Sequence, residues 1–302
     1  MLELWIPITV AAAFLQNVRS ALQKHLKSRL STSGATFVRF GFGFPLAIVY
    51  VAGLAVLADL PLPRPTPTFA LYVTVGGLTQ IFATALLVSL FSQRNFVVGT
   101  TYSKTETIQT AIFGIIILGD RLSAGAAAGI MISLAGVMAM SVAKSEVTLR
   151  GLLLSWTGRA ALVGIASGTF FAAAAVSYRA ASLSLGGEGF VMQAAFTLAC
   201  VTVLQTLAMM AYLHLREPGQ LAKVLVHWRV GLWVGVSGVA ASACWFTAMT
   251  IQNAAYVRAL GQVELLFTFL ASHFVFRERA TRLEVAGIGL TLAGILCLLL
   301  ST

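Results

Sequence analysis

Residues 129–137 read GIMISLAGV, and residues 287–295 read GIGLTLAGI. Five of these nine positions are identical, and two more are Ser/Thr and Val/Ile exchanges. The same ungapped shift of 158 residues also aligns four polar or charged pairs: Asn95 with Asn253, Glu106 with Glu264, Asp120 with Glu278 and Arg121 with Arg279. An ungapped shift that keeps two carboxylate pairs and a Gly-rich helix together indicates that the chain contains an internal duplication.

The composition places this duplicated chain in a membrane. Of its 302 residues, 58% are hydrophobic and only 10% are charged, and the mean hydropathy is +0.90. Soluble globular chains carry about 25% charged residues. So few charges cannot cover the surface of a soluble protein of this length, and we therefore expect an integral membrane protein.

Charged, Pro-rich and Gly-rich gaps divide the chain into apolar segments of the length that crosses a bilayer as a helix, which is about 20 residues. There are ten of them: 4–23, 35–58, 68–91, 96–118, 124–143, 159–182, 188–213, 229–251, 254–276 and 281–300. These segments are continuously apolar and do not alternate, so helices are favoured over a barrel. The expected fold class is an all-α integral membrane protein with ten transmembrane helices.

The duplication divides this fold into two five-helix repeats, residues 1–143 and 159–302, joined by the polar linker 144–158. Because five spans is an odd number, the second repeat enters the membrane from the opposite side to the first. Two inverted repeats are the architecture of many secondary transporters, whose substrate site lies at the repeat interface near the bilayer midplane. The duplication therefore favours transport.

The positive charge of the chain indicates topology. The net charge is +10, but the basic residues fall in the short gaps between apolar segments, which argues against a nucleic-acid partner. Thirteen of the 20 Lys and Arg residues follow the odd-numbered spans, and three follow the even-numbered ones. By the positive-inside rule, both termini of this inner-membrane (plasma-membrane) protein are expected outside the cytoplasm.

Two further stretches resemble a known family. GDRLSAGAAAGIMISLAGVMAM (119–140) and RERATRLEVAGIGLTLAGILCL (277–298) are similar to the two helix-hairpin signatures of the drug/metabolite transporter superfamily, in its ten-helix EamA-type branch. ATFVRF (35–40) resembles the pattern of the family's second span. Asp120 and Arg277 depart from the usual Gly-Glu-Arg-Leu-like turn. The resemblance implies a transporter with termini inside the cytoplasm, which conflicts with the charge count.

Glu106 and Glu264 are the candidate functional residues. Each lies in the middle of an apolar segment, about 16–21 Å from its ends at about 1.5 Å per residue. A carboxylate at that depth costs about 2.5 kcal/mol or more, so it must face protein or water. Each glutamate also lies on a helical stripe of small and polar residues. Either the carboxylates bind a cationic group of the substrate or a proton, or they form structural pairs with Lys104, Arg258 or a backbone group.

Other polar groups inside the spans extend this candidate site. Lys104 could hold a carboxylate and, together with a glutamate, would suit a zwitterion such as an amino acid. The remaining candidates for substrate contact are Tyr102, Gln262, Trp245, Gln80 and Gln16, for each of which a helix–helix hydrogen bond or an interfacial position is the alternative. We read Arg19, Arg39 and Arg258 as basic side chains that reach to the membrane interface.

The expected function is a secondary transporter that exports a small polar or amphipathic metabolite, such as an amino acid, by alternating access. The four histidines form no HExxH motif, and GxSxG and phosphate-loop motifs are absent, so we do not expect an enzyme. An intramembrane lipid-modifying enzyme and a non-transporting scaffold are the alternatives. The isolated cysteines suggest no metal site, and we expect no cofactor. Coupling to the proton gradient is left open. The expected partners are a small-molecule substrate and the lipid bilayer, and the protein is expected to be a monomer or a homodimer.

Overall fold

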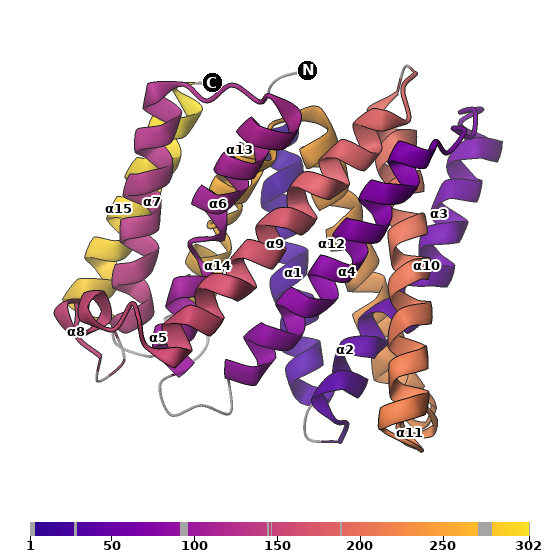
Figure 1. Ribbon diagram of the computed structural model, residues 1–302, viewed down its shortest axis with the longest axis horizontal. Coiled ribbons are helices and arrows are strands. Elements are labelled where there is room, and N and C mark those ends of the chain that lie inside the picture. The colour runs from indigo at the N-terminus through magenta and orange to yellow at the C-terminus, as the bar shows by residue number, and fades with distance from the viewer. Residues whose placement is uncertain are drawn as a thin grey trace. The chain divides into compact units, whose positions relative to one another are not determined.

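The computed structural model describes residues 4–26, 29–90, 96–143, 145, 147–187, 189–270 and 280–301. Every regular element in these ranges is a helix, which confirms the predicted all-α fold class (Figure 1). Three features of the sequence analysis lie outside the described residues: Asn95, the end of the predicted span 254–276, and the second hairpin turn with Arg277 and Glu278.

Within the described residues, seven helical stretches are long and apolar enough to cross a membrane. The predicted count of ten is not confirmed by this number and stays a prediction. The segments that are not among the seven are 4–23, 96–118 and 254–276. The first is one helix that carries several polar side chains, and the other two are each divided into shorter helices.

The helices gather into two compact units, and each unit takes segments from both halves of the sequence. Unit 1 comprises Met1–Leu78 and Ser177–Gln252. It contains α1 (Trp5–Leu26), α2 (Thr32–Gly41), α3 (Phe44–Leu57), the first part of α4 (Pro67–Leu90), the last part of α9 (Arg159–Ser184), α10 (Phe190–Arg216), α11 (Gln220–Val226) and α12 (Trp228–Ile251). The compact units therefore do not coincide with the two sequence repeats.

Unit 1 is built around α12, along which α1 packs, while α2, α3 and α10 also contact it. A hydroxyl joins two of these helices at one end of the unit. Ser31 Oγ caps α2 by accepting from the backbone N–H of Gly34 at 3.0 Å, and it donates to Glu217 Oε2 at 2.5 Å. Because Glu217 directly follows α10, this bond ties the start of α2 to the end of α10.

Unit 2 comprises Thr79–Val176 and Asn253–Thr302. Besides the rest of α4 and α9, it contains α5 (Phe96–Ser103), α6 (Glu106–Phe113), η1 (Gly114–Leu118), α7 (Ala124–Val142), α8 (Leu149–Leu154), α13 (Ala254–Gly261), α14 (Glu264–Leu270) and α15 (Arg282–Leu299). This unit therefore brings the fourth and fifth segments of both repeats together.

The helix boundaries in unit 2 repeat with the 158-residue shift found in the sequence. Helices α5 and α13 end at equivalent positions, α6 and α14 begin at the equivalent Glu106 and Glu264, and α7 and α15 also begin at equivalent positions. Even the caps correspond. Ser123 accepts from the N–H of Ala126, and its counterpart Thr281 accepts from the N–H of Glu284. The duplication is therefore visible in the local structure as well as in the sequence.

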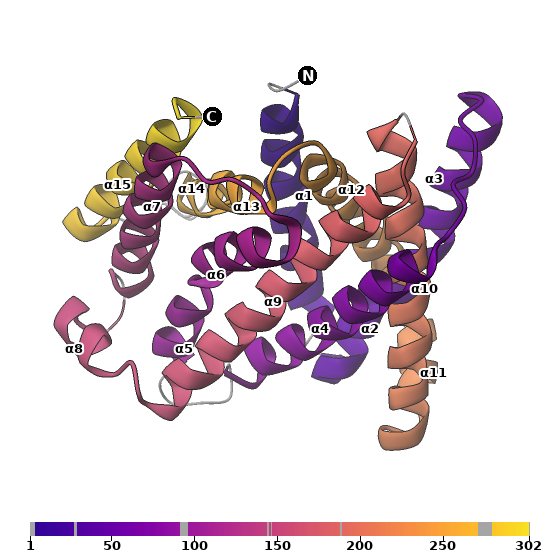
Figure 2. The ribbon, with the colours of Figure 1, turned by 45° about the horizontal axis from the view of Figure 1, so that its top comes forward.

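The fifth helices of the repeats, α7 and α15, pack against each other with their backbones almost in contact (Figures 1 and 2). A Cβ atom on Gly129 would lie 2.6 Å from the carbonyl oxygen of Gly294, and one on Gly136 would lie 2.6 Å from that of Gly287. A later residue of α7 thus meets an earlier residue of α15, so the two helices run antiparallel. This direction is the one expected for inverted repeats.

Candidate functional site: an ion-pair cluster at two broken helices

Two helices of unit 2 break at equivalent points, directly before the two glutamates. Between α5 and α6, the N–H groups of Lys104 and Thr105 bond to carbonyls three residues back, at 3.0 and 3.1 Å. Between α13 and α14, those of Gln262 and Val263 do the same, at 3.2 and 3.0 Å. Bonds of this spacing tighten a helix locally, and such a stretch inside a helix is frequent at functional positions.

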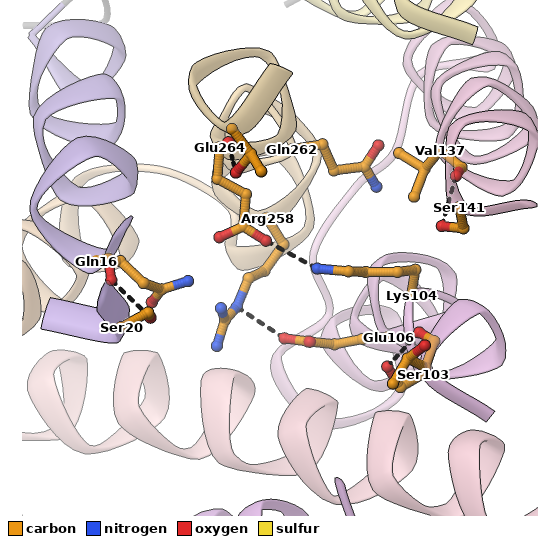
Figure 3. Close-up of polar contacts among 12 residues, drawn as sticks. Gln16, Ser20, Ser103, Lys104, Glu106, Val137, Ser141, Arg258, Gln262 and Glu264 are labelled. Atoms are coloured by element: carbon orange, nitrogen blue, oxygen red, sulfur yellow. Dashed lines mark hydrogen bonds and ion pairs between the residues drawn. The ribbon is translucent and has the colours of Figure 1, made fainter. Parts of the chain in front are cut away.

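Glu264, the first residue of α14, binds the side chain of Lys104. Lys104 Nζ donates to Glu264 Oε1 at 2.8 Å, a short charge-assisted hydrogen bond (Figure 3). The side chains of Lys104 and Glu264 are 34% and 18% exposed. This contact therefore joins the first repeat to the second and is partly exposed.

Glu106, the first residue of α6, has the corresponding contact with Arg258. Arg258 Nε lies 3.0 Å from Glu106 Oε1, and both side chains are less than one-fifth exposed (Figure 3). Although these two atoms are close, their geometry does not satisfy the criteria for a hydrogen bond, so the contact is an ion pair only. Each repeat thus contributes one glutamate and one cation to the same cluster. We call Lys104, Glu106, Arg258 and Glu264 the ion-pair cluster.

The glutamates of the ion-pair cluster obey the internal symmetry, whereas its cations do not. The position equivalent to Lys104 is Gln262, and the position equivalent to Arg258 is Thr100. The cluster therefore has two carboxylates at matching places and two cations at unmatched ones. Its charges balance, but its two halves are chemically different.

Gln262, two residues before Glu264 in the chain, belongs to a buried network of neutral polar groups. Its Nε2 donates to Thr107 Oγ1 at 2.9 Å, and its Oε1 accepts from the hydroxyl of Ser133 on α7. All three side chains are almost fully buried. The sequence analysis placed Gln262 among the site residues but did not select Ser133, which the ungapped repeat alone could not identify.

Close packing holds the first break in place. A Cβ atom on Gly168 of α9 would lie 2.9 Å from the carbonyl oxygen of Ser103 and 3.2 Å from the backbone nitrogen of Glu106. Only a glycine lets α9 approach the broken α5–α6 backbone this closely. The backbone that presents Lys104 and Glu106 is therefore supported by a neighbouring helix.

Tyr102 and Gln80 also lie in unit 2, but they do not join the ion-pair cluster through any described contact. The hydroxyl of Tyr102 donates to the carbonyl oxygen of Leu152 at 3.0 Å, and its ring packs in a buried group with Val98, Val142 and Ala161. Gln80 is buried in α4, and its carbonyl oxygen accepts from Thr84 Oγ1 at 2.8 Å. The Tyr102 contact is the helix–helix hydrogen bond weighed as the alternative to substrate contact.

Gln16 and Trp245 belong to unit 1, where they bind each other. Trp245 Nε1 donates to Gln16 Oε1 at 3.1 Å, which joins α1 to α12. The Trp245 side chain is buried. The structure therefore places the predicted residues in two groups, one in each unit. Arg258, which the sequence analysis read as reaching to the membrane interface and also weighed as a structural partner of a glutamate, pairs with Glu106 in the ion-pair cluster.

The ion-pair cluster suits a ligand that carries both charges. Two carboxylates and two cations lie inside predicted spans, so a polar solute would find partners for an ammonium group and for a carboxylate at the same place. Partly exposed charges at that depth must face water or protein, because exposure to lipid would cost several kcal/mol (about 2.5 or more) for each charge. The arrangement is therefore chemically able to exchange an internal ion pair for contacts with a zwitterion.

Comparisons with known proteins agree with this architecture. The model of the EamA-like transporter family matches residues 3–142 and, a second time, residues 158–300. A search of the curated proteins finds no match. Among solved structures, one crystal structure is similar over 98% of each chain, with a TM-score of 0.70 and 17% sequence identity, which shows the fold alone. Because the family model covers nearly the whole chain in two copies, this multi-pass membrane protein belongs to the EamA-like transporter family.

Proposed function

We propose that this protein is a secondary transporter of the inner (plasma) membrane that exports a small polar or amphipathic metabolite, an amino acid or a related compound, by alternating access. The observation that carries the proposal is the ion-pair cluster. It joins the broken helices of both repeats through a 2.8 Å contact between Lys104 and Glu264 and a 3.0 Å contact between Arg258 and Glu106. Broken helices that meet at a repeat interface are where secondary transporters bind their substrates.

Lys104 and Glu264 are the residues that we expect to contact the substrate. They form the more exposed pair of the ion-pair cluster, with a side-chain exposure of 34% for Lys104. An ammonium group of the substrate would replace Lys104 as the partner of Glu264, and the carboxylate of the same substrate would bind the released Lys104. The exchange keeps every charge compensated, which limits the desolvation cost that an unpaired ion would carry inside the membrane.

The experiment is uptake of radiolabelled amino acids into proteoliposomes that contain the purified full-length protein. A screen over amino acids, nucleosides and quaternary amines first identifies a transported solute. Glu264→Gln is then expected to lower its initial rate by about tenfold or more, the factor that corresponds to loss of about 1.4 kcal/mol of binding. Undiminished transport by this variant at several pH values would refute the role of Glu264.

Asp59→Asn is the matched control for that experiment. It is the same carboxyl-to-amide change, at an exposed position after α3 and outside the ion-pair cluster. We expect wild-type uptake from it. A thermal-unfolding profile of Glu264→Gln that keeps a single cooperative transition shows that lost transport is not lost folding.

Coupling of transport to the proton gradient is a further part of the proposal. Either carboxylate of the ion-pair cluster could carry a proton during one half of the cycle, in exchange for substrate. Uptake driven by an imposed pH gradient, and lost in Glu106→Gln or Glu264→Gln, supports this exchange. Uptake that is the same with and without the gradient contradicts it.

For orientation we propose that both termini lie outside the cytoplasm. The support is the excess of Lys and Arg in the gaps that follow the odd-numbered spans. A reporter fused after Thr302 that is active only outside the cytoplasm agrees with this orientation. A fusion that is active only in the cytoplasm overturns it.

A further inference from the structure

In each broken helix, the residue two positions before the glutamate donates to a side chain of the other repeat. In the first break this residue is Lys104, whose Nζ donates to Glu264 Oε1 at 2.8 Å. In the second break it is Gln262, whose Nε2 donates to Thr107 Oγ1 at 2.9 Å. The shift of 158 residues aligns Lys104 with Gln262. Equivalent positions of the two repeats therefore each direct a donor across to the opposite break.

The acceptors of these two donors are not equivalent. Lys104 binds Glu264, the first residue of α14, and the residue equivalent to Glu264 is Glu106, the first residue of α6. Gln262 binds Thr107 instead, which follows Glu106 directly in α6. In Figure 3, Lys104 points toward Glu264, whereas the Gln262 amide points toward α7. The amide is thus bound one residue away from the acceptor that the internal symmetry would give it.

Helix α7 holds the Gln262 amide in this place. Ser133 of α7 is fully buried, and its hydroxyl donates to Gln262 Oε1. The residue equivalent to Ser133 is Thr291 of α15, and its hydroxyl donates at 2.8 Å to the carbonyl oxygen of Gly287 in its own helix. The hydroxyls at this pair of positions therefore differ in the same way as the donors do, and the two repeats have different local conformations at their breaks.

This difference has a consequence in a chain of inverted repeats. The axis that relates such repeats lies in the membrane plane, so it also exchanges the two sides of the membrane. If the repeats exchange their local conformations, an arrangement open to one side becomes an arrangement open to the other. In the exchanged arrangement, Gln262 donates to Glu106, and Lys104 no longer donates to Glu264.

We infer that Gln262 is a positioning residue that changes its acceptor during the transport cycle, from Thr107 in the arrangement described here to Glu106 in the opposite-facing one. The inference rests on the proposed function, because it requires alternating access. Arg258 lies against Oε1 of Glu106, so the second carboxylate oxygen can accept the amide while this ion pair persists. Because the amide is neutral, its movement brings no further charge to the cluster.

The test compares the KM of the transported solute on the two faces of the membrane, in right-side-out and inside-out vesicles that contain the full-length protein. Ser133→Ala leaves the buried Gln262 Oε1 without its donor in the present arrangement alone, and it should therefore favour the opposite-facing one. We expect the ratio of the two KM values to change by about fivefold or more. Thr107→Val removes the other contact of the amide and should change the ratio in the same direction. A residue with only a structural role would lower stability without moving this ratio.

Ser141→Ala is the matched control on α7. Its hydroxyl donates at 2.8 Å to the carbonyl oxygen of Val137 in its own helix, so the same change should leave the KM ratio at its wild-type value. Gln262→Leu removes the amide in both arrangements. In that background, Ser133→Ala should no longer change the ratio, because the group on which it acts is gone.

The outcomes separate this inference from the proposed function. A solute that is transported with the same KM ratio in Ser133→Ala and Thr107→Val overturns the inference and leaves the transport proposal in place. A ratio that still changes with Ser133→Ala in the Gln262→Leu background also overturns it, since the effect then does not pass through Gln262. If one of the two single variants does not fold, the other carries the test. If the wild-type protein transports no solute, the proposed function is contradicted and the inference fails with it.

Discussion

Lys104 and Glu264 are 160 positions apart in the chain, yet Nζ and Oε1 lie 2.8 Å apart where two broken helices meet. Glu264 begins α14 in the second repeat, and Lys104 lies in the break after α5 in the first. The equivalent carboxylate, Glu106, is paired instead with Arg258. The two glutamates therefore occupy equivalent positions in the two repeats, whereas the cations that pair with them occupy positions that are not equivalent.

The first prediction concerns the energetic coupling of this pair. Lys104→Gln and Glu264→Gln should each lower the free energy of unfolding by about 1.5–3 kcal/mol, the range for hydrogen bonds to charged groups. The double variant should lose less than the two single losses combined, because neither ion is then left without its partner. Thermal unfolding in detergent measures all four proteins, and strictly additive losses would show that the two side chains do not interact.

The second prediction concerns the buried network at Gln262. Gln262→Leu leaves the Thr107 and Ser133 hydroxyls without the amide that binds both, and each buried polar group deprived in this way costs about 1–3 kcal/mol. Thr107→Val removes only one of the two bonds and should cost less. Denaturant or thermal unfolding ranks the variants, and an equal or greater loss in Thr107→Val would contradict the network.

The third prediction concerns the crossing of α7 and α15. A Cβ atom on Gly136 would lie 2.5 Å from the backbone nitrogen of Thr291, so Gly136→Ala must push two helix backbones apart. We expect it to destabilise the protein by about 1–3 kcal/mol, the usual cost of overpacking. The measurement is the midpoint of thermal unfolding.

Gly289→Ala is the matched control on α15. A Cβ atom there meets nothing within 4 Å, so alanine adds helix propensity without a clash and should be neutral or stabilising by up to about 1 kcal/mol. If Gly136→Ala and Gly289→Ala behave alike, the close approach of the two backbones is not what holds the helices together.

Much of this fold follows from the duplication. An ungapped shift already requires that equivalent segments have equivalent boundaries, and α5 and α13 end at equivalent residues while α7 and α15 begin at equivalent residues. The helix breaks after Ser103 and Gly261 could not be predicted from the sequence, because neither repeat carries a proline there and each segment has the pattern of one continuous apolar span. What ends each helix is a pair of local hydrogen bonds and a close neighbour such as Gly168, which the local pattern does not show.

The candidate site was predictable to a similar degree. The depth of the two glutamates in their spans singled them out, and Lys104 and Arg258 were weighed as their partners. Which cation meets which acid depends on contacts between residues more than 150 positions apart, and this information is absent from the periodicity of a single segment. For the same reason, the sequence could not show that Arg39 donates to Ser242 Oγ in the middle of α12 instead of extending to the membrane interface.

The fourth prediction separates structure from transport at Tyr102. Its hydroxyl donates to the carbonyl oxygen of Leu152 at 3.0 Å inside a buried apolar group, and it makes no described contact with the ion-pair cluster. Tyr102→Phe removes that bond and keeps the ring, so it should lower the free energy of unfolding by about 1 kcal/mol. Because the lost bond lies away from the proposed substrate contacts, the KM for the transported solute should stay at its wild-type value. Thermal unfolding and concentration-dependent uptake in proteoliposomes measure the two effects separately. A raised KM with unchanged stability would instead place Tyr102 at the substrate.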